Sequence, residues 1–127
     1  MQELRALLLV GAGGCLGSVG RYLLGGWVHR LLPFAAFPAG TLAVNVLGCL
    51  LIGLLGGLME HRQLLGSDLR LFLLIGVLGG FTTFSSFAYE TLALGRDAEP
   101  GRALVNVGAQ VVLGLVACWL GYALVRP

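Results

Sequence analysis

The sequence predicts an all-α membrane protein with four transmembrane helices, and three observations support this. Hydrophobic residues make up 57% of the 127 residues and charged residues only 11%, against roughly 25% charged in ordinary soluble domains. The mean hydropathy is +0.93. Long uncharged intervals separate the few charges, and a helix needs about 20 apolar residues to cross the hydrocarbon core. So few charges cannot cover a water-soluble monomer, and the chain is too apolar to be disordered.

The expected spans follow one another along the chain with short connections. The first contains one internal charge, Arg21, and ends before Pro33 and Pro38, which are typical of a connecting segment. Polar segments at about 61–68 and 95–100 separate the later spans. We therefore expect a single transmembrane domain over residues 1–127. Its four helices are expected at about 4–30, 39–60, 69–94 and 101–125.

The arginines give almost no orientation bias. Four spans place both termini on one side of the membrane, and lysine or arginine excess in the connections normally sets which side is cytoplasmic. Here four arginines fall on one side and three on the other: Arg5, Arg62, Arg70 and Arg126 against Arg30, Arg96 and Arg102. This pattern leaves two alternatives open, a weakly marked fixed topology and insertion in both orientations.

Glycine is concentrated in the expected spans, with 21 residues in the chain. Gly13 and Gly17, and likewise Gly53 and Gly57, have the spacing that lets two helix backbones approach closely. We expect these glycines at helix–helix contacts.

Several polar side chains fall inside the spans, where their cost marks them as functional candidates. Arg21 is either an anchor whose guanidinium reaches the headgroups or a cation that attracts anions into a vestibule. Thr41 and Asn45 are four residues apart and share a helix face. They form either an interhelical hydrogen bond or part of a polar pathway. Asn106 and Gln110 repeat this spacing in the fourth span.

Residues 79–87, with the sequence GGFTTFSSF, predict a break in the third span. Paired glycines followed by two threonines are poor helix formers, and irregular backbone at this depth persists only where its carbonyls find partners or line a cavity. Freed carbonyl oxygens suit a small cation such as Na⁺.

Phe84 and Phe87 share a face of the helix that follows the break. Their electropositive ring edges, with nearby hydroxyls and the Asn45 amide, would favour a small anion. Aromatic packing beside a glycine kink is the alternative.

Three motifs together resemble the Fluc (CrcB-type) fluoride channels. They are GSVGRY at 17–22, GTLAVN at 40–45 followed by Gly48, and GGFTTFSSF at 79–87 followed by Glu90. The resemblance covers all four expected helices in order, and the combination of the second and third motifs is specific. It implies a fluoride-selective channel that lets fluoride leave the cytoplasm passively, built as an antiparallel dual-topology homodimer in the cell (inner) membrane.

The resemblance also implies a central structural Na⁺ between two pores, held by the backbone carbonyls of Gly79 and Thr82. The partners it implies are fluoride, a second copy of the chain and membrane lipid, with no nucleic acid. Along the fluoride pathway, Asn45 would donate its amide hydrogens, with Thr83 and Ser86 nearby. The rings of Phe84 and Phe87 would meet fluoride edge-on. Arg21 would lie in an aqueous vestibule and Glu90 toward the far end of the pore. In place of the tyrosine and serine hydroxyls frequent in the family's fourth helix, this chain has Asn106, Gln110 and Gly114.

Two other classes of membrane protein compete with this interpretation. A small multidrug-resistance-type, proton-coupled exporter has a similar size. Such exporters resemble one another in having a glutamate inside the first helix, whereas this chain has Arg21 there. A structural or assembly subunit would explain the glycines but not the co-occurrence of Asn45 with the 82–87 run. We expect no enzyme, because the sequence shows no nucleophile–base pair, metal cluster or phosphate loop.

Overall fold

The computed structural model describes residues 1–33, 36–62 and 66–127, and every regular element within these ranges is helical. The third span is divided into several pieces, one of which, η1, is a π-helix. The elements are α1 (Gln2–Leu31), α2 (Ala39–Arg62), α3 (Ser67–Arg70), η1 (Leu71–Leu78), α4 (Gly79–Phe81), α5 (Phe84–Arg96) and α6 (Pro100–Ala123).

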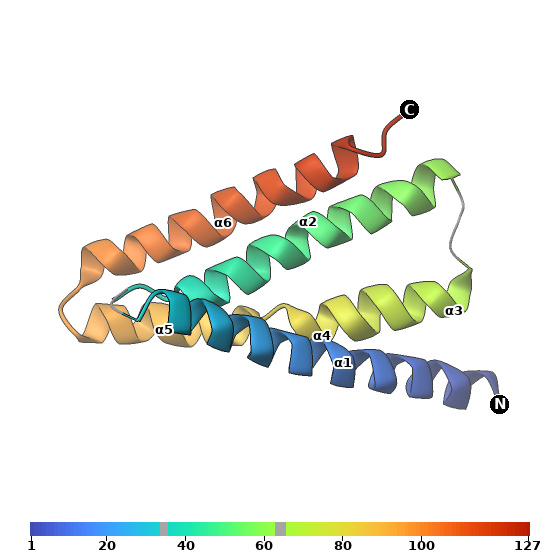
Figure 1. The fold of residues 1–127 in the computed structure, drawn as a ribbon, viewed down its shortest axis with the longest axis horizontal. Helices are drawn as coiled ribbons and strands as arrows, with labels where there is room; N and C mark the ends of the chain where they lie inside the picture. The colour runs from blue at the N-terminus through green and yellow to red at the C-terminus, as the bar shows by residue number, and fades with distance from the viewer. Residues whose placement is uncertain (34–35, 63–65) are drawn as a thin grey trace.

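The four expected spans are confirmed as helices long and apolar enough to cross a membrane. Their ends differ from the predicted ones by at most two residues. Figure 1 shows both chain termini at the same end of the helices, as four crossings require. α2 packs most extensively against α6, α1 packs against η1 and α4, and contacts between α1 and α2 join these two pairs.

The closest helix contacts are made through glycines, as the spacing predicted. Gly13 lies against the backbone of η1 at Phe72, and Gly17 against the backbone at Val77. Gly53 faces the carbonyl group of Cys118 on α6. A Cβ atom at any of these three glycines would overlap backbone atoms, which cannot move aside as a flexible side chain does. The glycines therefore set how near α1 lies to the third span and α2 to α6.

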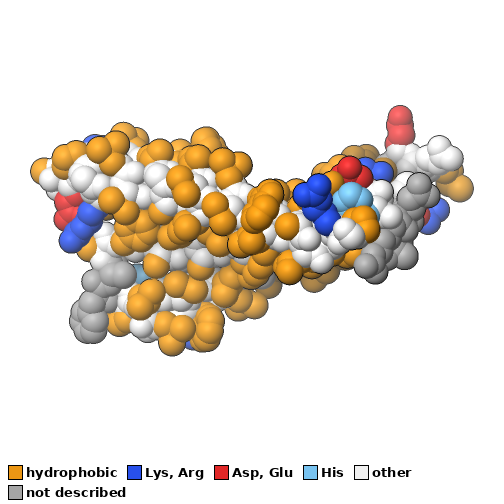
Figure 2. Space-filling view, turned by 90° about the horizontal axis from the view of Figure 1, so that it is seen from above, with side chains coloured by type: hydrophobic (Ala, Val, Ile, Leu, Met, Phe, Trp, Pro, Cys, Tyr) orange, Lys and Arg blue, Asp and Glu red, His pale blue; other side chains and the backbone are white. Residues whose placement is uncertain are grey.

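The molecular surface is largely apolar. Figure 2 shows one face on which hydrophobic side chains dominate and charged side chains gather toward the two ends. Large apolar side chains are widely exposed, among them Leu7 (69%), Leu104 (73%) and Trp119 (61%), whereas Val44 is almost fully buried (1%). An apolar surface of this extent marks contact with lipid or with another protein.

The third span breaks at Thr82 and Thr83, inside the segment where the sequence predicts it. Both residues have extended backbone, with φ −78° and ψ 158° at Thr82 and φ −149° and ψ 117° at Thr83. In a continuous helix the Thr83 N–H would donate to the Gly79 carbonyl. Here it donates instead to Asn45 Oδ1 on α2, over 2.8 Å. The break is therefore stabilised by a side chain from another span, which satisfies a backbone group that lipid could not.

Thr83 also caps α5, because its Oγ1 accepts a hydrogen bond from the Ser86 N–H over 3.2 Å. Thr83→Ala should lower the free energy of unfolding by about 1 kcal/mol through loss of this N-cap. Thr83→Ser keeps the hydroxyl and should remain close to wild type. Denaturant unfolding in detergent micelles measures both variants, and an equal loss in the two would mean that the cap is not what stabilises the start of α5.

Candidate functional site

A cavity of about 360 Å³ lies between α2, the broken third span and α6. Its wall includes Asn45, Thr82, Thr83, Phe84, Phe87 and Gln110, together with apolar side chains. The cavity thus brings together Asn45 of the second span, the break in the third span and Gln110 of the fourth span. Among the described residues that line it, none carries a charge at neutral pH.

Asn45 connects the three walls of this cavity. Its Nδ2 donates to the Thr83 carbonyl over 2.9 Å, and the Thr83 N–H donates to Asn45 Oδ1 over 2.8 Å. The second Nδ2 hydrogen bond, of 3.0 Å, is to Gln110 Oε1 on α6. Asn45 therefore makes the interhelical hydrogen bonds that were one of its two expected roles, and its side chain also lies at the cavity wall.

Phe84 and Phe87 form an aromatic pair at the cavity. Their ring centroids are 5.3 Å apart and their planes are inclined at 68°, an edge-to-face arrangement. Phe84 is 79% exposed, whereas Phe87 is half-buried. Because the edge of a phenyl ring is electropositive, the pair can present ring edges to a small anion.

Hydroxyl groups cluster where α5 begins. Thr83 Oγ1 donates to Ser86 Oγ over 3.0 Å, and Ser85 Oγ lies 3.4 Å from the same Thr83 oxygen. Thr83 is buried and lines the cavity, while Ser86 is connected to it through Thr83. Thr83 and Ser86 thus form a hydrogen-bonded pair at the start of α5, the helix that also carries Phe84 and Phe87.

The structure separates the two amides of α6, which the sequence treats alike. Gln110 lines the cavity, but Asn106 is fully buried behind it. Asn106 Nδ2 donates to Thr91 Oγ1 over 2.9 Å, and Thr91 Oγ1 donates to the Phe87 carbonyl over 2.8 Å. Sequence reasoning missed Thr91, although its position four residues after Phe87, on the same helix face, is a signal that could have identified it.

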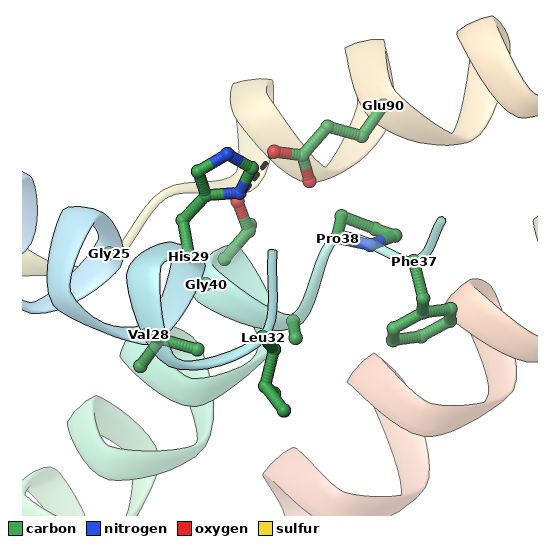
Figure 3. Close-up of a pocket in the computed structure, with 10 residues that line it drawn as sticks. Gly25, Val28, His29, Leu32, Phe37, Pro38, Gly40 and Glu90 are labelled. Carbon is green, nitrogen blue, oxygen red and sulfur yellow. Dashed lines mark hydrogen bonds between the residues drawn. The ribbon is translucent and has the colours of Figure 1, made fainter. Parts of the chain in front are cut away.

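Glu90 lies in a second pocket, of about 210 Å³, at the junction of α1, α2 and α5. Figure 3 shows the side chains of His29 and Glu90 pointing into this pocket, with Phe37 and Pro38 at its edge. Thr41 Oγ1 donates to Glu90 Oε1 over 2.6 Å. The other carboxylate oxygen is buried and has no hydrogen-bond partner in the part of the chain that the structure describes.

The remaining predicted residues occupy separate places. Arg21 lies half-buried on α1 and belongs to the wall of neither cavity.

Gly79 and Thr82 both line the 360 Å³ cavity. The Gly79 carbonyl has lost its regular helical donor, because the Thr83 N–H is bonded to Asn45. Hard backbone oxygens freed in this way have the chemistry that Na⁺ requires, so these residues fit the expected ion.

Together, the four apolar helices and the fold that they build define a multi-pass membrane protein with an uncharged cavity between three of its spans. Residues 8–122 match the family described as CrcB-like protein, Camphor Resistance (CrcB). The chain belongs to this family, which confirms the resemblance in the motifs of the second and third spans.

Three relatives, each named fluoride-specific ion channel FluC, match nearly the whole chain. The protein from Thermus thermophilus is 54% identical over 117 residues, which cover 92% of this chain and 91% of the relative. The protein from Opitutus terrae is 51% identical over 117 residues, covering 91% and 88% of the two chains. The protein from Methylobacillus flagellatus is 43% identical over 120 residues, covering 94% of each.

Proposed function

We propose that this protein is a fluoride channel that lets fluoride leave the cytoplasm passively across the cell (inner) membrane. The observation that carries the proposal is the cavity wall, in which two amides, two hydroxyls and two phenyl rings lie among apolar side chains and no described lining residue is charged. The names of the three relatives support fluoride as the ion. None of these names supports the multidrug-exporter alternative.

A wall of this kind suits conduction of a small, strongly hydrated anion. Neutral donors and ring edges replace part of the hydration shell while binding the ion weakly enough to release it. In this proposal Phe84 and Phe87 offer ring edges, and Asn45, Thr83 and Ser86 form the polar part of the route. Arg21 attracts anions from a vestibule and Glu90 lies toward the far end of the pore.

We also propose that two copies form an antiparallel homodimer in the lipid bilayer, with no nucleic-acid partner. The exposure of Phe84 supports this, because a ring placed on an ion pathway but 79% exposed in one subunit needs a second subunit to enclose it. Gly79 is also exposed. The backbone carbonyls of Gly79 and Thr82 from each copy would hold a structural Na⁺, which would supply a positive charge that stabilises the dimer.

Fluoride efflux from liposomes containing the purified protein, followed with a fluoride electrode beside chloride efflux, tests the channel. We expect rapid fluoride loss with chloride retained. Phe84→Ile should slow fluoride efflux by about tenfold or more, because isoleucine has no electropositive ring edge. Tyr89→Ile is the matched control, since Tyr89 is an exposed aromatic on the same helix but outside the cavity wall. Absence of fluoride loss from folded wild-type protein would overturn the proposal.

A further inference from the structure

The break in the third span releases backbone carbonyls on its N-terminal side. A helical carbonyl accepts from the N–H four residues later, and the extended backbone of Thr82 and Thr83 interrupts the hydrogen bonds that would span them. The N–H groups of Thr83 and Ser86 donate to side chains instead. The carbonyls of Gly79 and Thr82, four residues earlier in each case, therefore lose their helical donors.

Gly80 lies between these two carbonyl groups, and its own carbonyl also precedes the extended residues. This carbonyl accepts a hydrogen bond from Ser18 Oγ on α1, over 3.4 Å. Ser18 belongs to the GSVGRY motif at 17–22. A side chain of the first span thus supplies a partner to irregular backbone of the third, which has no water to turn to at this depth.

The face of α1 that carries Ser18 also touches the backbone of α4. Gly14 is one helical turn before Ser18 and lies on the same face. A Cβ atom at Gly80 would overlap the Gly14 carbonyl group, so the two backbones are in contact. A Cβ atom at Gly17 would likewise overlap the backbone nitrogen of Phe81. Backbone contact and the Ser18 hydrogen bond therefore act together on α4.

α4 depends on support from outside because it is short and rich in glycine. It has only three residues, two of which are Gly79 and Gly80, and glycine has the widest backbone freedom. Thr82, which follows α4, is held by its own span, since its N–H and its Oγ1 both donate to the Leu78 carbonyl over 3.0 Å. Gly80 is held by a different span, through Ser18.

We propose that Ser18 is a positioning residue for the cation site: by holding the Gly80 carbonyl, it directs the flanking carbonyls of Gly79 and Thr82 so that both can bind one Na⁺. That Na⁺ binds at these two carbonyls rests on the proposed function. Ser18 does not bind the cation in this arrangement, because its hydroxyl hydrogen is given to Gly80. Ser18 and Gly79 are both exposed, so a second copy can reach the site that Ser18 organises.

Sodium-dependent thermal unfolding in detergent tests this assignment without transport. The purified protein is equilibrated in N-methyl-D-glucamine chloride and titrated with NaCl at constant ionic strength, since a ligand that binds only the folded state raises the melting temperature. Ser18→Ala removes the donor and should need about fivefold more Na⁺ for the same rise, as expected for one net hydrogen bond. Ser18→Thr keeps the hydroxyl and should stay within about twofold of wild type.

Val19→Ala is the matched control, because Val19 follows Ser18 in α1, is exposed and has no hydrogen-bonding side chain. It should need the same Na⁺ concentration as wild type. Fluoride efflux gives a second measurement: Ser18→Ala should conduct slowly at low Na⁺ and approach the wild-type rate when Na⁺ is raised about fivefold. A purely structural defect would instead lower the melting temperature equally at every Na⁺ concentration.

Each result has a separate meaning. A higher Na⁺ requirement in Ser18→Ala, but not in Ser18→Thr or Val19→Ala, supports the assignment. An unchanged requirement in folded Ser18→Ala, or an equal shift in Ser18→Ala and Ser18→Thr, overturns it. Absence of sodium-dependent stabilisation in wild type overturns the cation site and the role of Ser18 with it. Absence of fluoride efflux from wild type that still responds to Na⁺ overturns the fluoride channel and leaves the role of Ser18 intact.

Discussion

Asn45→Asp should reduce fluoride efflux by at least about a hundredfold, one of the two largest effects we expect. A negative charge about 4 Å from a passing anion opposes it by about 4 kcal/mol at an effective dielectric constant near 20. This repulsion alone corresponds to about a thousandfold in occupancy. The carboxylate would stand at the wall of the cavity, facing the break in the third span.

The same substitution should also reverse the Gln110 amide. A carboxylate can still accept the Thr83 N–H, but it has no hydrogen for the Thr83 carbonyl or for Gln110 Oε1. The lowest-energy response is for Gln110 to turn its nitrogen toward the new carboxylate. The hydrogen bonds that join α2 to the break and to α6 would then be rearranged, so that this change and the added charge act in the same direction.

Liposome efflux and thermal unfolding, measured on the same preparations, test this prediction. Cys49→Ala is the matched control, because Cys49 lies one helical turn beyond Asn45 and lines the same cavity without a hydrogen bond to Thr83 or Gln110. It should conduct within about twofold of wild type. Near-normal efflux from a folded Asn45→Asp variant would show that Asn45 does not face the ion route.

The spans and the break could be predicted from the sequence because both depend on local properties. Each span is predominantly apolar over a length that suits a bilayer, and the adjacent Gly79–Gly80 and Thr82–Thr83 pairs disfavour a continuous helix wherever they stand. Phe84 and Phe87 could be placed on one face because they lie on the same helix, three residues apart. Such inferences need no knowledge of how the helices pack.

The connections across the cavity could not be predicted, because they depend on packing between distant segments. Asn45 is 38 residues from Thr83 and 65 from Gln110, and no periodicity in the sequence pairs them. Asn106 and Gln110 share a spacing and a chemistry, yet one is buried against α5 and the other lines the cavity. Nor does the apolar run of residues 71–78 indicate a π-helix, since its composition suits an α-helix equally well.

Gly53→Ala should lower the free energy of unfolding by about 3 kcal/mol, through overpacking of α2 against α6. The new Cβ would overlap the Cys118 carbonyl, and backbone cannot yield without separating the two helices. Gly56→Ala, three residues further along α2, places its Cβ where no atom lies within 4 Å. That control should be neutral or more stable by up to about 1 kcal/mol, because alanine favours the helix over glycine.

The packing defect should reach the cavity, since α2 carries Asn45 and α6 carries Gln110. Their 3.0 Å hydrogen bond leaves little tolerance for separation of the helices, and its loss would free Gln110 to rotate. We therefore expect Gly53→Ala to slow fluoride efflux even below its unfolding temperature, whereas Gly56→Ala conducts normally. Thermal unfolding monitored by tryptophan fluorescence, with efflux measured well below the midpoint, separates the two consequences. If Gly53→Ala unfolded early but conducted normally while folded, the spacing of α2 and α6 would matter for stability and not for conduction.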